Sequence, residues 1–239
     1  MGTLTFVRHG QARAFEKNSD QLSPLGEEQA RLLGHYWVKH GVSFDEVYSG
    51  TLIRQQQTAE IVRQCFNEAG LSWPERIATS DLNEYDADGI SRKLIPAFAE
   101  RDEKFRGLLA EFEAHRNSPD RNRYFQRMFE VVTQLWLSGE LEVDGFETWV
   151  SFQTRVRRAL KQIVSAEGSG RRVVVFTSGG VIGATVQTVL EAPERQALHI
   201  NWRVKNCSLT EFTFGSGRIS LDMFNSLPHL DDSAMKTFR

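Results

Sequence analysis

The sequence is poor in cysteine, and it lacks both a long apolar run and a surplus of either charge. Its two cysteines, Cys65 and Cys207, are far apart and do not have the spacing of a metal-binding motif. We therefore expect buried thiols in a reducing compartment, with a disulfide as the less favoured alternative. No stretch approaches the roughly 18 consecutive apolar residues that a membrane-spanning helix needs. The first residues lack the basic region and apolar core of a secretory signal, and Phe6 stands where N-myristoylation requires Ser or Thr. These absences predict a cytoplasmic protein with no membrane partner.

The balance of charge argues against another class of partner. The 239 residues include 29 basic and 31 acidic side chains, for a formal net charge of -2. Such a balance gives no electrostatic basis for binding nucleic acid, although it leaves room for a local cationic pocket. A chain of this length suits one core with a large insertion better than two ordinary domains. We expect a single domain over residues 1–239.

Strand-like runs alternate with amphipathic helices along most of the chain. Three strand-like runs, at residues 4–7, 46–48 and 172–177, each lead into a helix. Ser23 is a suitable cap for the first of these helices, with Pro24 at its first position. The run at 172–177 is nearly continuous, which is typical of a central parallel strand. Residues 209–214 and 218–224 predict a closing hairpin. The pattern predicts an α/β fold, a three-layer sandwich with a mostly parallel central sheet.

Strand signals stop between residues 88 and 146, and helical periodicity replaces them. Apolar side chains recur at helical spacing on two faces: Phe105, Leu108, Leu109 and Phe112 on the first, and Phe125, Phe129, Val132 and Trp136 on the second. The charged segment 115–121 separates the two helices, as an ordinary exposed turn or, less favoured, as a lip over a pocket. A further helix leads back to the central strand, with an apolar face formed by Phe152, Val156, Ala159, Leu160 and Ile163. We expect residues 88–146 to form a helical cap insertion.

The first expected strand ends in a run of residues that could take part in catalysis. Leu4 to Val7 leads directly into Arg8, His9, Gly10 and Gln11. At the carboxyl end of a strand, where α/β sheets place their ligands, His9 could attack phosphorus while Arg8 neutralises the phosphate oxygens. A solvated strand end is the plainer alternative, and the Arg-His pair alone favours it.

Two further runs favour a phosphate site over a solvated strand end. Arg54 falls in the first turn of the helix after the second strand, where its guanidinium and the positive helix end both suit phosphate. Taken alone, Arg54 would also pass for a surface arginine. Residues 81–86 bring carboxylates to another expected strand end, and one of them could protonate a leaving oxygen. Helix capping explains the same carboxylates equally well.

Taken together, these runs resemble the histidine phosphatase superfamily, which contains phosphoglycerate mutases and related phosphomonoesterases. The resemblance covers the chain outside the cap. It rests on these segments: Phe6 to Gly10, Leu22 to Ala30, Ser49 to Ala59, Leu82 to Glu84, Phe146 to Val156, Gly179 to Ile182 and Phe224 to Leu230. Matching in this order along the chain is specific for the fold.

The resemblance implies roles for five residues. His9 would carry a phosphohistidine, and Glu84 would be the proton donor. Arg8 and Arg54 would hold the phosphate, with Gln11 as a polar neighbour. No metal and no cofactor are implied, because the two arginines balance the charge of phosphoryl transfer.

One departure from the family pattern concerns Ser178. Family members carry a second histidine before a double glycine, whereas this chain has Ser178 before Gly179 and Gly180. The serine hydroxyl could still reach a phosphate oxygen, but the charge that an imidazole can carry is gone. By analogy with the loss of one preorganised donor, the rate would fall roughly 100- to 1,000-fold. His199 or His229 could substitute, although each is expected to be structural or exposed.

Two other interpretations of this segment are not favoured. Ser178 follows a strand, but Phe176 stands where a nucleophile elbow requires glycine. The run from Gly179 to Gly183 lacks the G-x-G spacing of a dinucleotide-binding loop.

The sequence therefore predicts a metal-independent phosphomonoester phosphatase, a hydrolase that works through a phosphohistidine on His9 and is weakened by Ser178. The alternative is a protein that binds phosphate or a phosphorylated ligand without turning it over. A phosphoglycerate mutase is less favoured, because a mutase needs a site that excludes water. The expected partner is a small phosphorylated substrate, and its identity and a homo-oligomeric state are left open.

Overall fold

The computed structural model describes residues 1–13, 18–140 and 143–238, which form two compact units. The first unit contains Met1–Glu84 and Arg155–Arg239, and the second contains Tyr85–Thr154. The helical insertion predicted for residues 88–146 falls within the second unit, which extends further at both ends.

Six strands form one sheet in the first unit, in the order β3-β2-β4-β1-β5-β6. The strands are β1 (Gly2–Arg8), β2 (Glu46–Ser49), β3 (Arg76–Ala78), β4 (Arg172–Thr177), β5 (Leu209–Gly215) and β6 (Arg218–Ser226). The pairs β3-β2, β2-β4 and β4-β1 are parallel, whereas β5 pairs antiparallel with both β1 and β6. The predicted α/β fold with a mostly parallel central sheet is confirmed, and the run at 172–177 is the central strand β4.

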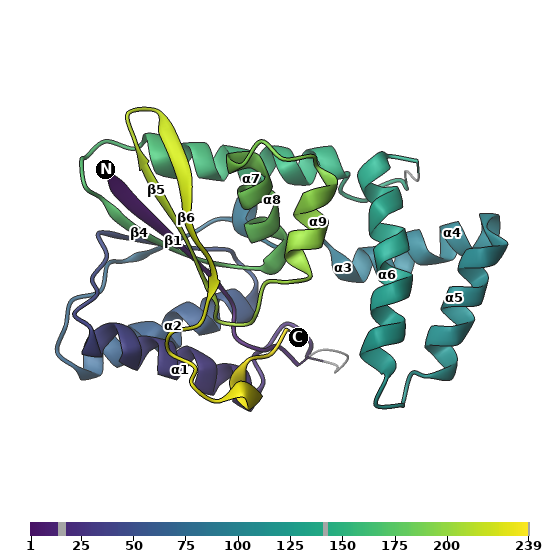
Figure 1. Cartoon of the computed structure of the whole chain (residues 1–239), viewed down its shortest axis with the longest axis horizontal. Coiled ribbons are helices and arrows are strands. Elements are labelled where there is room, and N and C mark those ends of the chain that lie inside the picture. Colours follow the sequence, from purple (N-terminus) through teal and green to yellow (C-terminus); the bar gives the residue numbers. More distant parts are fainter. Residues whose placement is uncertain (14–17, 141–142, 239) are drawn as a thin grey trace. The chain divides into compact units, whose positions relative to one another are not determined.

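Helices cover both faces of this sheet. α1 (Pro24–Lys39) and α2 (Ile53–Glu68) pack together on one face, and α8 (Gly179–Val189) and α9 (Arg195–Asn201) pack together on the other (Figure 1). The part of α7 (Trp149–Ser165) that follows Thr154 belongs to the same unit. The expected three layers are therefore present.

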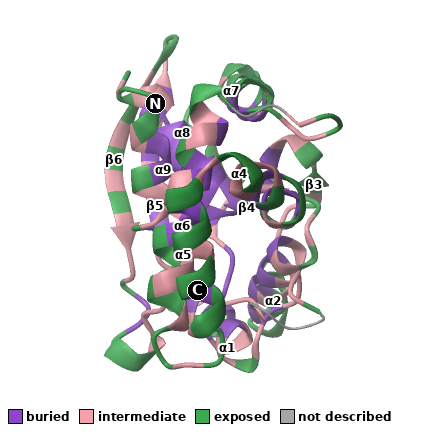
Figure 2. Ribbon diagram, turned by 90° about the vertical axis from the view of Figure 1, so that its right-hand side faces the viewer, coloured by how far each residue is buried: buried purple, intermediate pink, exposed green. Residues whose placement is uncertain are grey.

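One buried hydrophobic cluster of the first unit lies between the sheet and the helix pair α1 and α2. Val174 and Phe176 of β4 are fully buried there, and Trp37 of α1 and Phe66 of α2 pack into the same cluster. Figure 2 shows buried residues concentrated on β4, β5 and α8. A strand that is buried on both faces needs apolar side chains at nearly every position, which explains the uninterrupted apolar run of β4.

The beginning of α1 follows the sequence signal closely. The hydroxyl of Ser23 accepts a hydrogen bond from the N–H of Gly26 at 3.1 Å, and Pro24 is the first helical residue. A cap of this kind satisfies one of the backbone donors that a helix start leaves open.

The second unit is helical. It contains α3 (Ala87–Gly89), the π-helical turn Ile90–Leu94, α4 (Ile95–Arg101), α5 (Glu103–Ala114), α6 (Arg121–Ser138) and the start of α7. The predicted break at 115–121 separates α5 from α6. Phe105, Phe129 and Trp136 are buried as the periodicity predicted, whereas Leu108 and Phe125 are only partly buried. The periodicity did not indicate the helical segments between Ala87 and Arg101.

The segment that carries Glu84 differs from the prediction. β3 ends at Ala78, and a 3-10 turn over Ser80–Leu82 follows it. Glu84 therefore lies beyond that turn rather than at a strand end. β3 has three residues and, among the described strands, pairs with β2 alone. The apolar signal that marks a strand is therefore too short to locate its end.

Among the helices of the described residues, none combines the length and the apolar character needed to cross a membrane. Both cysteines are free and buried, as expected from their spacing.

Candidate active site

The carboxyl ends of three parallel strands bring the predicted site residues together. Arg8, the last residue of β1, pairs with Thr177 of β4, and the N–H of His9 donates to the Thr177 carbonyl at 2.8 Å. Ser49, the last residue of β2, pairs with Phe176 of the same strand. The segments that follow β1, β2 and β4 therefore start side by side, and they carry His9, Arg54 and Ser178.

His9 is held as a neutral imidazole with one nitrogen turned toward Arg54. Its side chain is 6 % exposed, and its Nδ1 lies 2.7 Å from the carbonyl oxygen of Gly10. A carbonyl only accepts hydrogen bonds, so Nδ1 carries the proton and Nε2 carries the lone pair. The Nε–H of Arg54 donates to that Nε2 at 3.1 Å. Burial lowers the pKa of His9 well below its usual value, and the charges of Arg54 and Arg8 lower it further.

Two glycines let the loop after His9 lie directly against the start of α1. A Cβ atom on Gly10 would stand 2.3 Å from the Gly26 carbonyl oxygen, and one on Gly26 would stand 2.1 Å from that of Gln11. Neither position has room for a side chain. The loop is thereby fixed by backbone packing, which fixes the orientation of the imidazole.

Arg54 lies in the first turn of α2, where the sequence placed it. Its Nη1 forms an ion pair with Asp20 Oδ1 at 2.5 Å, and Asp20 Oδ2 accepts from the N–H of Ile53 at 2.9 Å. Sequence reasoning missed Asp20. Its only local signal was a carboxylate shortly before the Ser23 cap, which is also common in ordinary turns.

Arg8 and Gln11 are anchored by their surroundings. Arg8 donates through Nη1 to the carbonyl of Val204, and its charge is close enough to lower the pKa of His9. The Gln11 side chain accepts a hydrogen bond from the Ser23 hydroxyl at 2.8 Å. Both residues flank His9 in the chain, and their contacts with phosphate remain predictions.

Glu84 faces the start of α8. Its Oε2 accepts a hydrogen bond from the N–H of Gly180 at 3.0 Å. Arg155, which sequence reasoning did not single out, donates through Nη1 to the carbonyl of Asn83 at 2.7 Å and to that of Asp81 at 3.1 Å. Arg155 therefore holds the irregular segment that presents Glu84.

Ser178 directly precedes α8 and is fully buried. Its hydroxyl oxygen accepts a hydrogen bond from the Gln55 side-chain amide at 2.8 Å. The same amide group donates to the carbonyl of Leu82 at 3.2 Å. Gln55 was also missed from the sequence, because a glutamine beside two other glutamines on a helix gives no sign of burial. It joins the three segments that carry Arg54, Glu84 and Ser178.

Two further buried amides, those of Gln29 and Asn206, bond the backbone around His9. Asn206 donates to the carbonyl of His9 at 3.2 Å, and Gln29 accepts from the N–H of Gln11 at 2.8 Å. Both side chains also bond the segment near Thr237: Gln29 donates to its hydroxyl, and that hydroxyl donates to Asn206, each at 2.9 Å. Neither amide was predicted from the sequence.

The other two candidate histidines lie in contrasting environments. His199 is exposed on α9. His229 is 8 % exposed, and among the described residues neither of its ring nitrogens has a hydrogen-bond partner. Burial lowers the pKa of His229 to about 4.

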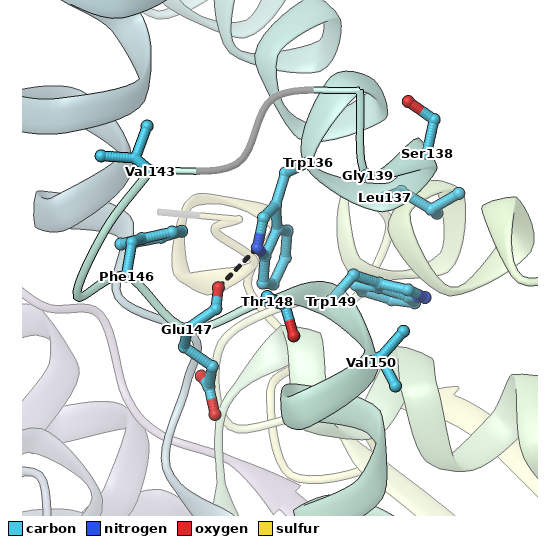
Figure 3. Close-up of a pocket in the computed structure, with 10 residues that line it drawn as sticks. All are labelled: Trp136, Leu137, Ser138, Gly139, Val143, Phe146, Glu147, Thr148, Trp149 and Val150. Carbon is cyan, nitrogen blue, oxygen red and sulfur yellow. Dashed lines mark hydrogen bonds between the residues drawn. The ribbon is translucent and has the colours of Figure 1, made fainter.

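A pocket of about 270 Å³ lies in the second unit, between the end of α6 and the start of α7 (Figure 3). Trp136, Phe146 and Trp149 contribute to its wall, and the indole N–H of Trp136 donates to the Glu147 carbonyl at 2.7 Å. A wider groove of about 530 Å³ on the first unit is formed by side chains of α1, α2 and β3. Neither is lined by any of the six predicted site residues. In the parts of the chain that are described, no three His, Cys, Asp or Glu side chains gather where they could hold a metal ion.

The model of the histidine phosphatase superfamily (branch 1) matches residues 4–136 and 118–227. The chain belongs to this superfamily. The match includes the segments that carry His9, Arg54, Glu84 and Ser178, and it agrees with the resemblance drawn from the sequence.

Several curated relatives of this superfamily member are named phosphoglycerate mutases. A 2,3-bisphosphoglycerate-dependent phosphoglycerate mutase from Sinorhizobium fredii is 25% identical over 207 residues, which cover 84% of this chain and 85% of that protein. The protein with the same name from Rhizobium rhizogenes is 33% identical over 186 residues, covering 73% of this chain and 78% of its own length.

Solved structures of named phosphatases share the fold. Phosphoserine phosphatase from Entamoeba histolytica, as an H9A mutant in complex with phosphoserine, superimposes with a TM-score of 0.60 at 19% identity, over 96% of this chain and 100% of that one. A putative alpha-ribazole-5'-P phosphatase from Escherichia coli gives a TM-score of 0.61 at 22% identity, over 95% and 98% of the two chains. At these identities the likeness is one of fold.

Proposed function

We propose that this protein is a phosphomonoester phosphatase that works through a phosphohistidine on Nε2 of His9. The observation that carries the proposal is the state of that imidazole. A hydrogen bond to Gly10 fixes the proton on Nδ1, and burial and two arginines keep the ring neutral. A neutral imidazole with an available lone pair can act as a nucleophile. The adjacent guanidinium of Arg54 would stabilise the negative phosphoryl oxygens of the phosphohistidine that forms.

The reaction would run in two steps. The lone pair of His9 Nε2 forms a bond to phosphorus as the bond from phosphorus to the leaving oxygen breaks, and Glu84 gives that oxygen a proton. A water molecule then attacks the phosphohistidine, Glu84 takes its proton, and the electron pair of the N–P bond returns to Nε2. Arg8 and Arg54 stabilise the phosphate oxygens throughout, so no metal ion is required.

Hydrolysis is proposed in preference to mutase chemistry, although the relatives compared above are named mutases. A mutase must return the phosphoryl group to a bound product before water reaches it. We propose that Ser178 leaves the site without a second histidine, and that its burial against Gln55 keeps its hydroxyl out of such finely arranged chemistry. We further propose a small phosphorylated substrate and a cytoplasmic location, which the two free thiols support.

The burial of Ser178 also favours a second candidate function. If position 178 gives no help to the transferring group, the site would bind a phosphorylated ligand without turnover. Such a protein would keep the affinity of Arg8 and Arg54 for phosphate while lacking catalysis.

Phosphate release from a panel of phosphomonoesters, including p-nitrophenyl phosphate, separates the two functions. The wild type is compared with His9→Ala, Ser178→His and the exposed control His35→Ala, at equal folding. A phosphatase loses release in His9→Ala, keeps it in His35→Ala and gains it in Ser178→His. Silence of both the wild type and His9→Ala across the panel would overturn the phosphatase and leave the binding protein.

A further inference from the structure

The site contains a carboxylate for which the proposed reaction has no use. Asp20 forms an ion pair with Nη1 of Arg54 at 2.5 Å, and its other oxygen accepts from the backbone N–H of Ile53 at 2.9 Å. The Asp20 side chain is 35% exposed and that of Arg54 is 18% exposed. One anion therefore occupies two donors of the first turn of α2.

These two donors are the ones that suit a phosphate group. The start of a helix attracts anions through its open N–H groups and its positive end. α2 begins after Leu52, whose side chain has no oxygen with which to cap the helix. Asp20 supplies a cap from a distant part of the chain, and in doing so it takes the place of an external anion.

Asp20 is also the end of a chain of contacts that starts at the nucleophile. Arg54 donates through Nε to His9 Nε2 at 3.1 Å and through Nη1 to Asp20. A phosphoryl group on or near Nε2 would place its oxygens beside the same guanidinium. Since the guanidinium has a limited number of donors in a fixed plane, an arriving phosphate and the Asp20 carboxylate compete for it.

We propose that Asp20 sets the affinity of this site for phosphate, by pairing with Nη1 of Arg54 until a phosphate group binds and then giving that donor up. The proposal rests on the phosphate site described above. Asp20 remains close after the exchange, and repulsion between its negative charge and the phosphate weakens binding. Weaker binding favours release of inorganic phosphate after hydrolysis, because this product has no other group that could contact the protein.

Titration calorimetry with inorganic phosphate tests this proposal without requiring turnover. Asp20→Asn keeps the size of the side chain and removes its charge, and we expect phosphate to bind about tenfold more tightly, the ratio that corresponds to about 1.4 kcal/mol. Asp20→Ser, which keeps only a short neutral acceptor, should tighten binding in the same direction. Asp20→Glu restores the carboxylate and should return the affinity toward that of the wild type.

Asp45→Asn is the matched control. Asp45 also accepts from a backbone N–H and from an arginine, in this case both of Arg172, but it lies before β2 at the opposite strand end of the sheet. Its substitution should leave the affinity for phosphate unchanged.

The possible results distinguish the role of Asp20 from the existence of the phosphate site. Equal or weaker phosphate binding in folded Asp20→Asn and Asp20→Ser overturns the role of Asp20; weaker binding would show that the carboxylate orients Arg54 for phosphate. If neither the wild type nor these variants bind phosphate at millimolar concentrations, the proposed phosphate site itself is wrong.

Discussion

At the scale of single residues, the chemistry of the site depends on what surrounds His9. The imidazole is buried, its Nδ1 is bonded to a backbone carbonyl, and its Nε2 receives a hydrogen bond from Arg54. None of these properties can be read from the tripeptide Arg8-His9-Gly10. The residue types were evident from the sequence, whereas the protonation state follows from burial and from a residue 45 positions away.

The charge of Arg54 gives the first prediction at this scale. Arg54→Met removes a cation that lowers the pKa of His9, so that pKa should rise. It should stay below the ordinary value, because burial is the larger cause and is retained. The measurement is an NMR titration of the His9 ring protons. The control is Arg63→Met, which removes an exposed arginine from the same helix; a shift of equal size there would contradict the account.

Ser178 carries the second prediction at this scale. Because its hydroxyl oxygen is buried and accepts from Gln55, Ser178→Ala leaves a buried donor without that partner. The free energy of unfolding should fall by about 1–3 kcal/mol, while the affinity for inorganic phosphate changes less than twofold. Denaturation and phosphate titration measure the two effects. A large loss of phosphate affinity at unchanged stability would show that Ser178 binds the phosphate directly.

At the scale of elements, local sequence signals predicted the main helices and strands but not the polar side chains that connect them. The Ser23-Pro24 cap and the apolar run of β4 were readable because each is specified by neighbouring residues. Gln55, Arg155 and Asn206 were not, because each bonds backbone groups that only the folded chain brings near. A polar side chain gives no local sign of such burial. The irregular segment before Glu84 was mislocated because β3, with three residues, is too short for its pattern to show where the strand ends.

The segment near Thr237 supports the loop that carries His9, and it gives a prediction at the element scale. Thr237→Val removes the hydroxyl that bonds both Gln29 and Asn206 while keeping the shape of the side chain. We expect kcat to fall about three- to tenfold with little change in KM. The lost hydrogen bond, of roughly 1 kcal/mol, would leave the His9 loop less precisely positioned for attack.

Steady-state kinetics on p-nitrophenyl phosphate measures this effect. Thr188→Val is the control, because the Thr188 hydroxyl accepts one hydrogen bond from Arg157 and is not part of the hydrogen-bonded group formed by Gln29, Asn206 and Thr237. The same loss of kcat in both variants, or no loss in Thr237→Val, would show that the segment does not act on the loop.

At the scale of the whole molecule, buried imidazoles tie stability to pH. His229 has a pKa of about 4 when folded and close to 6.5 when unfolded. Between these values the unfolded chain binds more protons, so stability falls as the pH falls from about 6.5 to 4. The loss from His229 alone is about 3 kcal/mol, at about 1.4 kcal/mol per unit of pKa.

His229→Leu should remove this part of the dependence and should stabilise the protein at pH 5 relative to the wild type. Urea unfolding at pH 7 and pH 5 measures both effects. His199→Leu, which changes an exposed histidine, is the control. If the wild type and His229→Leu lose the same free energy between the two pH values, His229 is not the source of the dependence.

The proposed reaction passes through a phosphohistidine on His9, which can be trapped and detected. The wild type is mixed with p-nitrophenyl phosphate, quenched at alkaline pH within one turnover, and digested for mass spectrometry. We expect an acid-labile phosphate on the peptide that contains His9, and none after His9→Ala. Release of p-nitrophenol with no phosphate on that peptide at any quench time would contradict the account.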